Sequence, residues 1–143
     1  MALNRRLVLW APGLVIGLIV LLLAVWSTRQ STPPQTVRCP NLAAGCSVAL
    51  AGRTIELGVE GELRVLKPFQ LWVKAPGARR VQAQFTMVNM DMGFNLYTLR
   101  PDAQGVFRGR IVLPVCVSGR RDWLMSLEID GQRIEVPFVT ELS

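Results

Sequence analysis

The feature that most restricts this chain is a 20-residue stretch, from Leu7 to Trp26, without a single charged side chain. An α-helix rises about 1.5 Å per residue, so a helix of this length covers about 30 Å, the thickness of the hydrocarbon core of a bilayer. Trp10 and Trp26 lie near the two ends, where indole rings favour the membrane interface. The sequence therefore predicts one N-terminal transmembrane helix over residues 7–26.

Positive charges set the expected orientation of this helix. Arg5 and Arg6 directly precede the apolar stretch, which places residues 1–6 in the cytoplasm. The alternative is a cleaved signal peptide, but its apolar core is usually shorter, and Ala24-Val25-Trp26 is a poor cleavage site. We therefore expect a single-pass protein of the bacterial inner membrane whose remaining chain lies in the periplasm.

The rest of the chain divides into a linker and one domain. Residues 27–36 are polar and contain two adjacent prolines, which predicts an extended linker. Residues 37–143 are numerous enough for a single two-layer core. All 10 acidic residues lie in this part, interspersed with bases, so the overall net charge of +6 forms no basic stripe. We expect no nucleic-acid partner.

Short apolar segments with turn residues between them run through the whole domain. Residues 81–87 show the alternation of a half-buried strand, with apolar side chains at every second position. Seven or eight such strands with no amphipathic helix predict an all-β fold, namely an immunoglobulin-like antiparallel β-sandwich. The expected strands are residues 47–50, 54–58, 69–74, 81–87, 94–99, 106–113, 123–129 and 133–139.

The chain contains no histidine. This excludes Ser-His-Asp and Cys-His catalysis, histidine-bound zinc and blue-copper centres. No general-base pair, nucleophile arrangement or phosphate-binding glycine loop is visible either, so we do not expect an enzyme.

Sulfur ligands remain available for metal binding. Met87, Met90 and Met92 form a cluster, and Cys116 follows a later strand. Thiolate and thioether sulfur select copper(I), which does not require imidazole. In an extended segment Met90 and Met92 would project to the same side. Met87 continues the apolar face of its strand, so it is either a core residue or a fourth ligand.

The expected alternation of strand direction places these sulfurs at one end of the domain. If each connection reverses the chain direction, the strands that end at Met87 and Leu113 run the same way, so Met90, Met92 and Cys116 lie at one end of the sandwich. The same count, interrupted by the long segment 59–68, places Cys46 at that end too. The sequence therefore predicts a copper(I) site there.

Cys39 and Cys46 have two possible roles. In an oxidising compartment, two cysteines seven residues apart can form a disulfide, which would leave Cys116 outside it. Alternatively, all three thiols bind metal. We favour the disulfide.

Two motifs resemble a known family. The segment Phe85 to Gly93 (FTMVNMDMG), followed by Leu113 to Arg120 (LPVCVSGR) and Asp122-Trp123, is similar to FixH/YtkA-like periplasmic domains. The resemblance covers residues 68–139 and the N-terminal anchor, and Cys39 and Cys46 are a departure from it. It implies a membrane-tethered β-sandwich for copper handling and cytochrome oxidase assembly, with Met90, Met92 and Cys116 at the matching positions.

Two functions follow as hypotheses. The first is a tethered periplasmic copper(I)-binding protein that delivers or buffers copper for a periplasm-facing membrane protein such as a cytochrome oxidase. The second is a metal-free accessory subunit that acts through protein contacts of its anchor and its sandwich.

Overall fold

The structure is a computed structural model that describes residues 3–28, 34–90, 95–116 and 119–141, with backbone alone for 3–12 and 27–28. It separates into two compact units, Met1–Thr32 and Pro33–Ser143.

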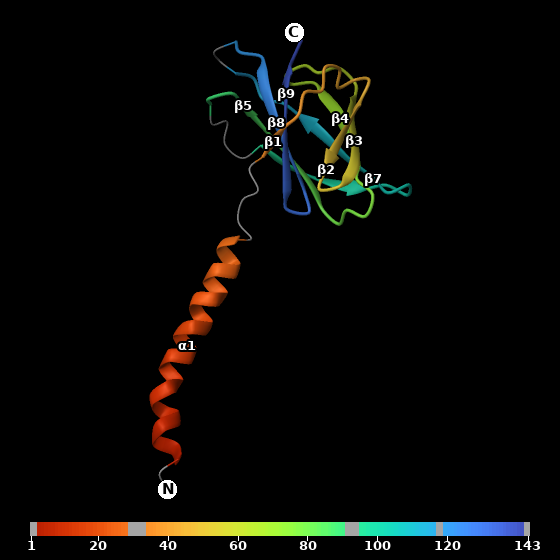
Figure 1. Cartoon of the computed structure of the whole chain (residues 1–143). Coiled ribbons are helices and arrows are strands. Elements are labelled where there is room, and N and C mark those ends of the chain that lie inside the picture. The colour runs from red at the N-terminus through yellow and green to blue at the C-terminus, as the bar shows by residue number, and fades with distance from the viewer. Residues whose placement is uncertain (1–2, 29–33, 91–94, 117–118, 142–143) are drawn as a thin grey trace. The chain divides into compact units, whose positions relative to one another are not determined.

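The first unit is a single helix, α1, which runs from Leu3 to Thr28 (Figure 1). It extends beyond both ends of the predicted segment, and every described side chain from Gly13 to Trp26 is exposed. Judged on the described residues, none of the helices combines the length and the apolar character that crossing a membrane requires.

The second unit is built of strands, as the sequence predicts. All eight expected strands are present, and their bounds move by a few residues at most. In chain order they are β2 (Cys46–Leu50), β3 (Arg53–Glu60), β4 (Pro68–Lys74), β5 (Val81–Met87), β6 (Leu96–Pro101), β7 (Val106–Val112), β8 (Asp122–Ile129) and β9 (Gln132–Val139).

A ninth short strand, β1 (Gln35–Thr36), lies inside the segment expected to be linker. It pairs in parallel with β9, and the Val37 amide extends this pairing by donating to the Glu135 carbonyl at 2.8 Å. The second unit therefore begins before residue 37, because the exposed edge of β9 satisfies the polar backbone groups that follow the prolines.

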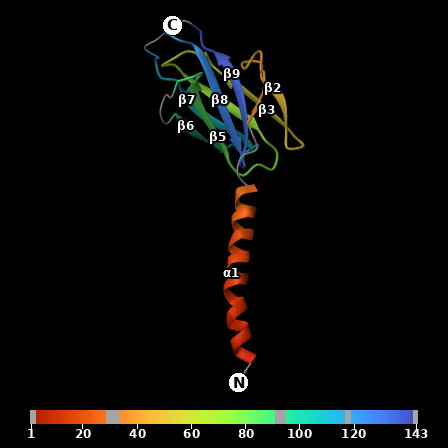
Figure 2. The same cartoon turned by 60° about the vertical axis from the view of Figure 1, so that its left-hand side comes forward.

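The strands form one curled sheet in the order β1-β9-β8-β5-β6-β7-β4-β3-β2. Strand β6 makes the bend: Leu96–Leu99 pair with β5, while Arg100 and Pro101 pair with β7. Tyr97 fastens the bend, because its hydroxyl donates to the Val112 carbonyl at 2.8 Å. The two halves thus face each other as an all-β, sandwich-like fold (Figure 2).

The core lies between the two halves of the sheet. Phe85 of β5 stands at its centre, edge-to-face with Phe69 of β4, Tyr97 of β6 and Phe138 of β9, at ring-centroid distances of 5.9–6.2 Å. Such aromatic pairs stabilise a core beyond the area they bury.

The two ends of this domain differ. Strands β5, β7 and β9 end where β4 and β8 begin, as the facing pairs Met87–Trp123, Val112–Pro68 and Val139–Asp122 show. We call this end the sulfur pole, for reasons given below. The opposite end, the hairpin pole, carries the tight turns 51–52, 102–105 and 130–131.

Candidate metal centre

Cys116 and Met90 meet at the sulfur pole. The thiol of Cys116 lies 3.8 Å from the sulfur of Met90, although 26 residues separate them in the chain. The sequence predicts that these segments share one end of the sandwich, and for Cys116 and Met90 this is confirmed.

The position of Met90 depends on a tight turn after β5. Its amide donates to the Met87 carbonyl at 3.1 Å, and Asn89 adopts a positive φ of 61°. Asparagine tolerates this left-handed conformation better than most residues. The chain therefore turns directly before Met90, while the relation expected between Met90 and Met92 falls on residues outside the described part of the chain.

The position of Cys116 depends on the segment that follows β7. The Leu66 amide holds Leu113 through a 2.9 Å bond to its carbonyl, and the Cys116 carbonyl accepts a bond from the Gly119 amide at 3.1 Å. The Cys116 side chain is 8% exposed and Met90 is partly buried against the core. The sulfur pair therefore sits at the margin of the core, within reach of the surface.

Met87 lies deeper. Its side chain is 2% exposed and belongs to the core, opposite the fully buried Trp123 in the β5–β8 ladder. Its environment is that of a packing residue beneath the pair. Met92, the other methionine expected at this site, lies outside the described residues.

A cation stands beside Cys116. The Arg120 guanidinium forms a two-bond pair with Asp122, of which the Nε–Oδ1 bond measures 2.9 Å. The pKa of Arg120 is raised chiefly by this hydrogen bond and by the charge of Asp122, and to a smaller extent by the charge of Cys116. Arg120 therefore lies within electrostatic range of the Cys116 sulfur, although its guanidinium is already paired with Asp122.

A small cavity of about 180 Å³ adjoins Cys116. Arg120, Arg121, Thr140 and Glu141 contribute to its wall. The Thr140 hydroxyl is buried and has no hydrogen-bond partner among the described residues. Cys116 thus belongs to the margin of the core and borders a partly polar space.

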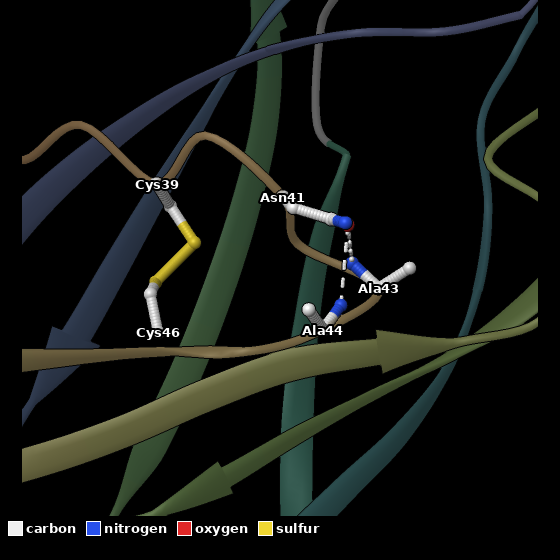
Figure 3. Close-up of a disulfide and its surroundings, with 5 residues drawn as sticks. All are labelled: Cys39, Asn41, Ala43, Ala44 and Cys46. Carbon is white, nitrogen blue, oxygen red and sulfur yellow. Dashed lines mark hydrogen bonds between the residues drawn. A yellow bond between two sulfur atoms is a disulfide. The ribbon is translucent and has the colours of Figure 1, made fainter.

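Cys39 and Cys46 are joined as a disulfide, so the favoured prediction is confirmed (Figure 3). The loop between them turns on Asn41, whose side-chain oxygen accepts bonds from the amides of Ala43 and Ala44 at 3.1 and 3.2 Å. With both sulfurs bonded to each other, the alternative of three thiols on one metal is not the arrangement found.

A larger cavity adjoins this disulfide and not the Cys116–Met90 pair. It measures about 740 Å³ and is lined by Cys39, Leu63 and Phe138 among others, and it shares Glu141 with the small cavity. Its volume does not make it the better metal site, because a metal site is defined by its donor atoms, and both sulfurs of the disulfide are already bonded.

The donor set of Cys116 and Met90 fits copper(I). Two sulfurs 3.8 Å apart can both bind one ion at a metal–sulfur distance of about 2.3 Å, enclosing an angle of about 110°. That angle suits trigonal or tetrahedral coordination and excludes a linear one. Within the described residues there is no group of three or more thiol, imidazole or carboxylate ligands.

Comparisons with known proteins identify no relative of this chain. No family model, no curated protein and no solved structure matches the chain.

Proposed function

We propose that this protein binds copper(I) through Cys116 and Met90, with Met92 and Met87 as the further sulfur candidates. The observation that carries the proposal is the 3.8 Å separation of a thiol and a thioether from two distant segments. Both donors are soft, and no histidine is present to favour another metal.

We further propose that α1 anchors the protein in the bacterial inner membrane and that the domain lies in the periplasm. The long run of exposed apolar side chains along α1 supports the anchor, since such a surface in water is unfavourable. The Cys39–Cys46 disulfide supports an oxidising compartment. A reporter fused after Ser143 should then be active only outside the cytoplasm. Release of a fragment without residues 7–26 would contradict the anchor.

The biological role we propose is delivery or buffering of copper for a periplasm-facing membrane protein such as a cytochrome oxidase. This step depends on the likeness to FixH/YtkA-like domains, as does the immunoglobulin-like description of the sandwich. A tether and a soft-metal site on one chain suit a copper donor to a membrane-bound recipient.

The test is a copper(I) titration of the full-length protein against a competing chelator, with the Cys39–Cys46 disulfide kept intact so that its sulfurs do not bind the metal. Met90→Leu keeps apolar volume but removes a sulfur, so the copper affinity should fall about tenfold or more. Cys116→Ser should lower it at least as far. Met125→Leu is the matched control, because Met125 is a fully buried core residue and its variant should bind copper like the original protein.

Thermal unfolding separates ligand loss from misfolding. A methionine-to-leucine exchange costs under about 1.5 kcal/mol where the side chain only packs. If Met90→Leu and Cys116→Ser both retain full copper affinity, these residues are not the ligands. If the original protein binds no copper(I), the metal-free accessory role is the better description.

A further inference from the structure

Strand β2 forms one end of the curled sheet, so one of its two edges is paired with β3 and the other faces outward (Figure 2). In the β2–β3 hairpin, Leu50 and Arg53 flank a two-residue turn, and a pair in this position exchanges both of its backbone hydrogen bonds. Such bonded pairs alternate with unbonded ones along an antiparallel ladder. Ser47 and Ala49 therefore direct their amides and carbonyls away from β3, to the outer edge.

These outward backbone groups are unpaired and accessible. In the part of the chain that the structure describes, no backbone or side-chain partner bonds to the amide or carbonyl of Ser47 or Ala49. Both residues are exposed. The disulfide reaches β2 from the core side, because Cys46 lies on the same face of the strand as the buried Val48. The edge is therefore open to another strand.

The other end of the sheet is protected against such pairing. There β1 covers the first half of β9, and β1 is only two residues long. Farther along the same edge of β9, position 137 is a proline, which has no amide to donate. Very short edge strands and edge prolines are two means by which proteins prevent unwanted strand pairing. Strand β2 has five residues and contains neither proline nor charge. Of the two ends, β2 is thus the one suited to strand addition.

A second copy of this chain fits the β2 edge. Antiparallel pairing about a two-fold axis at Val48 sets Ser47 of each copy opposite Ala49 of the other. Each of these two pairs exchanges both backbone hydrogen bonds, so together they satisfy all the outward groups of Ser47 and Ala49 in both copies. No shift of register is needed, because the outward groups are placed symmetrically about Val48.

The side chains permit this close approach. Because β2 is uncharged, a two-fold axis brings no like charges face to face, a contact that destabilises strand pairing. The facing side chains on the outer surface are serine and alanine, which are small. The loop before β2 ends in Ala44 and Gly45, so it presents no bulky group to the turn at Ala51 of the other copy. On the core side Val48 meets its own counterpart, and such β-branched pairs are favourable.

We propose that two copies of this chain associate through their β2 edges and join their curled sheets into one continuous sheet. This inference goes beyond the proposed copper function and does not depend on it. One strand of five residues is far smaller than the 20–30 residues a side of a standard stable interface. The dimer should therefore be weak and should form as the protein concentration rises.

The first experiment follows protein mass and amide hydrogen exchange on the same samples of full-length protein in detergent, over a range of concentrations. We expect the protein mass to double as the concentration rises. Exchange at the Ser47 and Ala49 amides should slow in step with this doubling, because dimerisation gives them acceptors. The amide of Ala103, in the exposed turn 102–105, is the internal control and should exchange at the same rate throughout.

A pair of charge variants tests the register. In Ser47→Lys with Ala49→Lys, each lysine would lie directly opposite a lysine of the other copy, and the dissociation constant should rise about tenfold or more. In Ser47→Lys with Ala49→Glu, each lysine would instead face a glutamate, so dimerisation should return. Ala103→Lys with Gln104→Lys adds the same charge at exposed turn positions and should leave the dimer unchanged. Unfolding midpoints check that each variant is folded.

The outcomes decide the inference separately from the copper function, which enters none of these measurements. A protein that stays a single copy at every concentration would overturn it, and the β2 edge would then be available to a strand of another protein. A dimer whose formation leaves exchange at Ser47 and Ala49 unaltered would also overturn it, because the copies would meet elsewhere. The same holds for a dimer that the double-lysine change does not weaken, or that the lysine–glutamate change does not restore.

Discussion

Gly58 allows a tryptophan to lie against the sheet beside the disulfide loop. In β3 it faces Trp72 of β4, and an added Cβ would lie 2.5 Å and 2.8 Å from two atoms of the indole and 3.0 Å from the Cα of Gly45. Carbon atoms pack best at 3.5–4.0 Å. The same ring also lies close to Gly45, where an added Cβ would be 3.0 Å from it. Gly58→Ala should therefore force the indole out of its place.

The expected magnitude follows from two opposing terms. Overpacking of this kind costs about 1–3 kcal/mol. Alanine in a strand, however, is favoured over glycine by about 0.5–1 kcal/mol. The net loss in unfolding free energy should be about 1–2 kcal/mol, which lowers the midpoint of thermal unfolding by about 4–8 °C in a domain of this size. Near-ultraviolet circular dichroism measures this midpoint and also reports on the tryptophan environment.

The control for this prediction removes the ring. In a Trp72→Leu background the clash is gone, so Gly58→Ala should become neutral or stabilising, and a double-mutant cycle should give a coupling energy of at least about 1 kcal/mol. If Gly58→Ala has the same effect in both backgrounds, or stabilises the original protein, the close packing of Trp72 on Gly58 is not what the structure indicates.

Three further predictions concern other parts of the domain. Replacing Cys39 and Cys46 together by serine should lower the unfolding free energy by about 2–2.5 kcal/mol, which is the closure entropy of so short a loop. Alkylation of the isolated protein should label Cys116 alone until the protein is reduced. Three labelled thiols before reduction would contradict the disulfide. Hydrogen bonds from the Arg79 and Arg80 amides lower the pKa of Asp130. The Asp130 carboxylate therefore stabilises the fold above the ordinary pKa of 3.8, and this contribution is lost as the pH falls through the lowered pKa of the folded state. Denaturant midpoints measured between about pH 6 and 2.5 should decline less in Asp130→Asn than in the original protein, and parallel curves would refute this. Leu66→Asn should raise the unfolding midpoint by a few degrees, because asparagine tolerates the positive φ of 61° better than leucine, whereas a lower midpoint would show that the Leu66 side chain stabilises the domain.

Local pattern was sufficient to predict the main strands. In β5 apolar and polar side chains alternate without exception, and turn residues such as Asp130-Gly131 separate the strands, so both signals are contained in neighbouring residues. Strand β1 could not be predicted, because its two polar residues acquire their structure from the edge of β9, some 100 residues further along the chain. The bend through β6 depends on Tyr97 and Val112 in the same non-local way.

The candidate site could likewise be predicted only in part from the sequence. Chain alternation was enough to place Met90 and Cys116 at one end of the sandwich, but their separation of 3.8 Å depends on the turn at Asn89 and on the anchoring of Leu113 by Leu66. Asn89 carried a local signal for that turn, since asparagine is common at positive φ. The contact between Leu66 and Leu113 joins distant segments and leaves no trace in the local pattern.

Leu66 combines a strained backbone conformation with an exposed side chain. It has a positive φ of 61°, a conformation that costs an L-residue with a branched side chain about 1–2 kcal/mol, and glycine or asparagine would fit there more easily. Leucine usually compensates such a cost by burial, yet this side chain is 65% exposed. The backbone bond from its amide to Leu113 does not depend on the side chain. The side chain of Leu66 therefore contributes little to the stability of the domain, so its replacement by a residue that tolerates a positive φ should remove the strain without loss of packing.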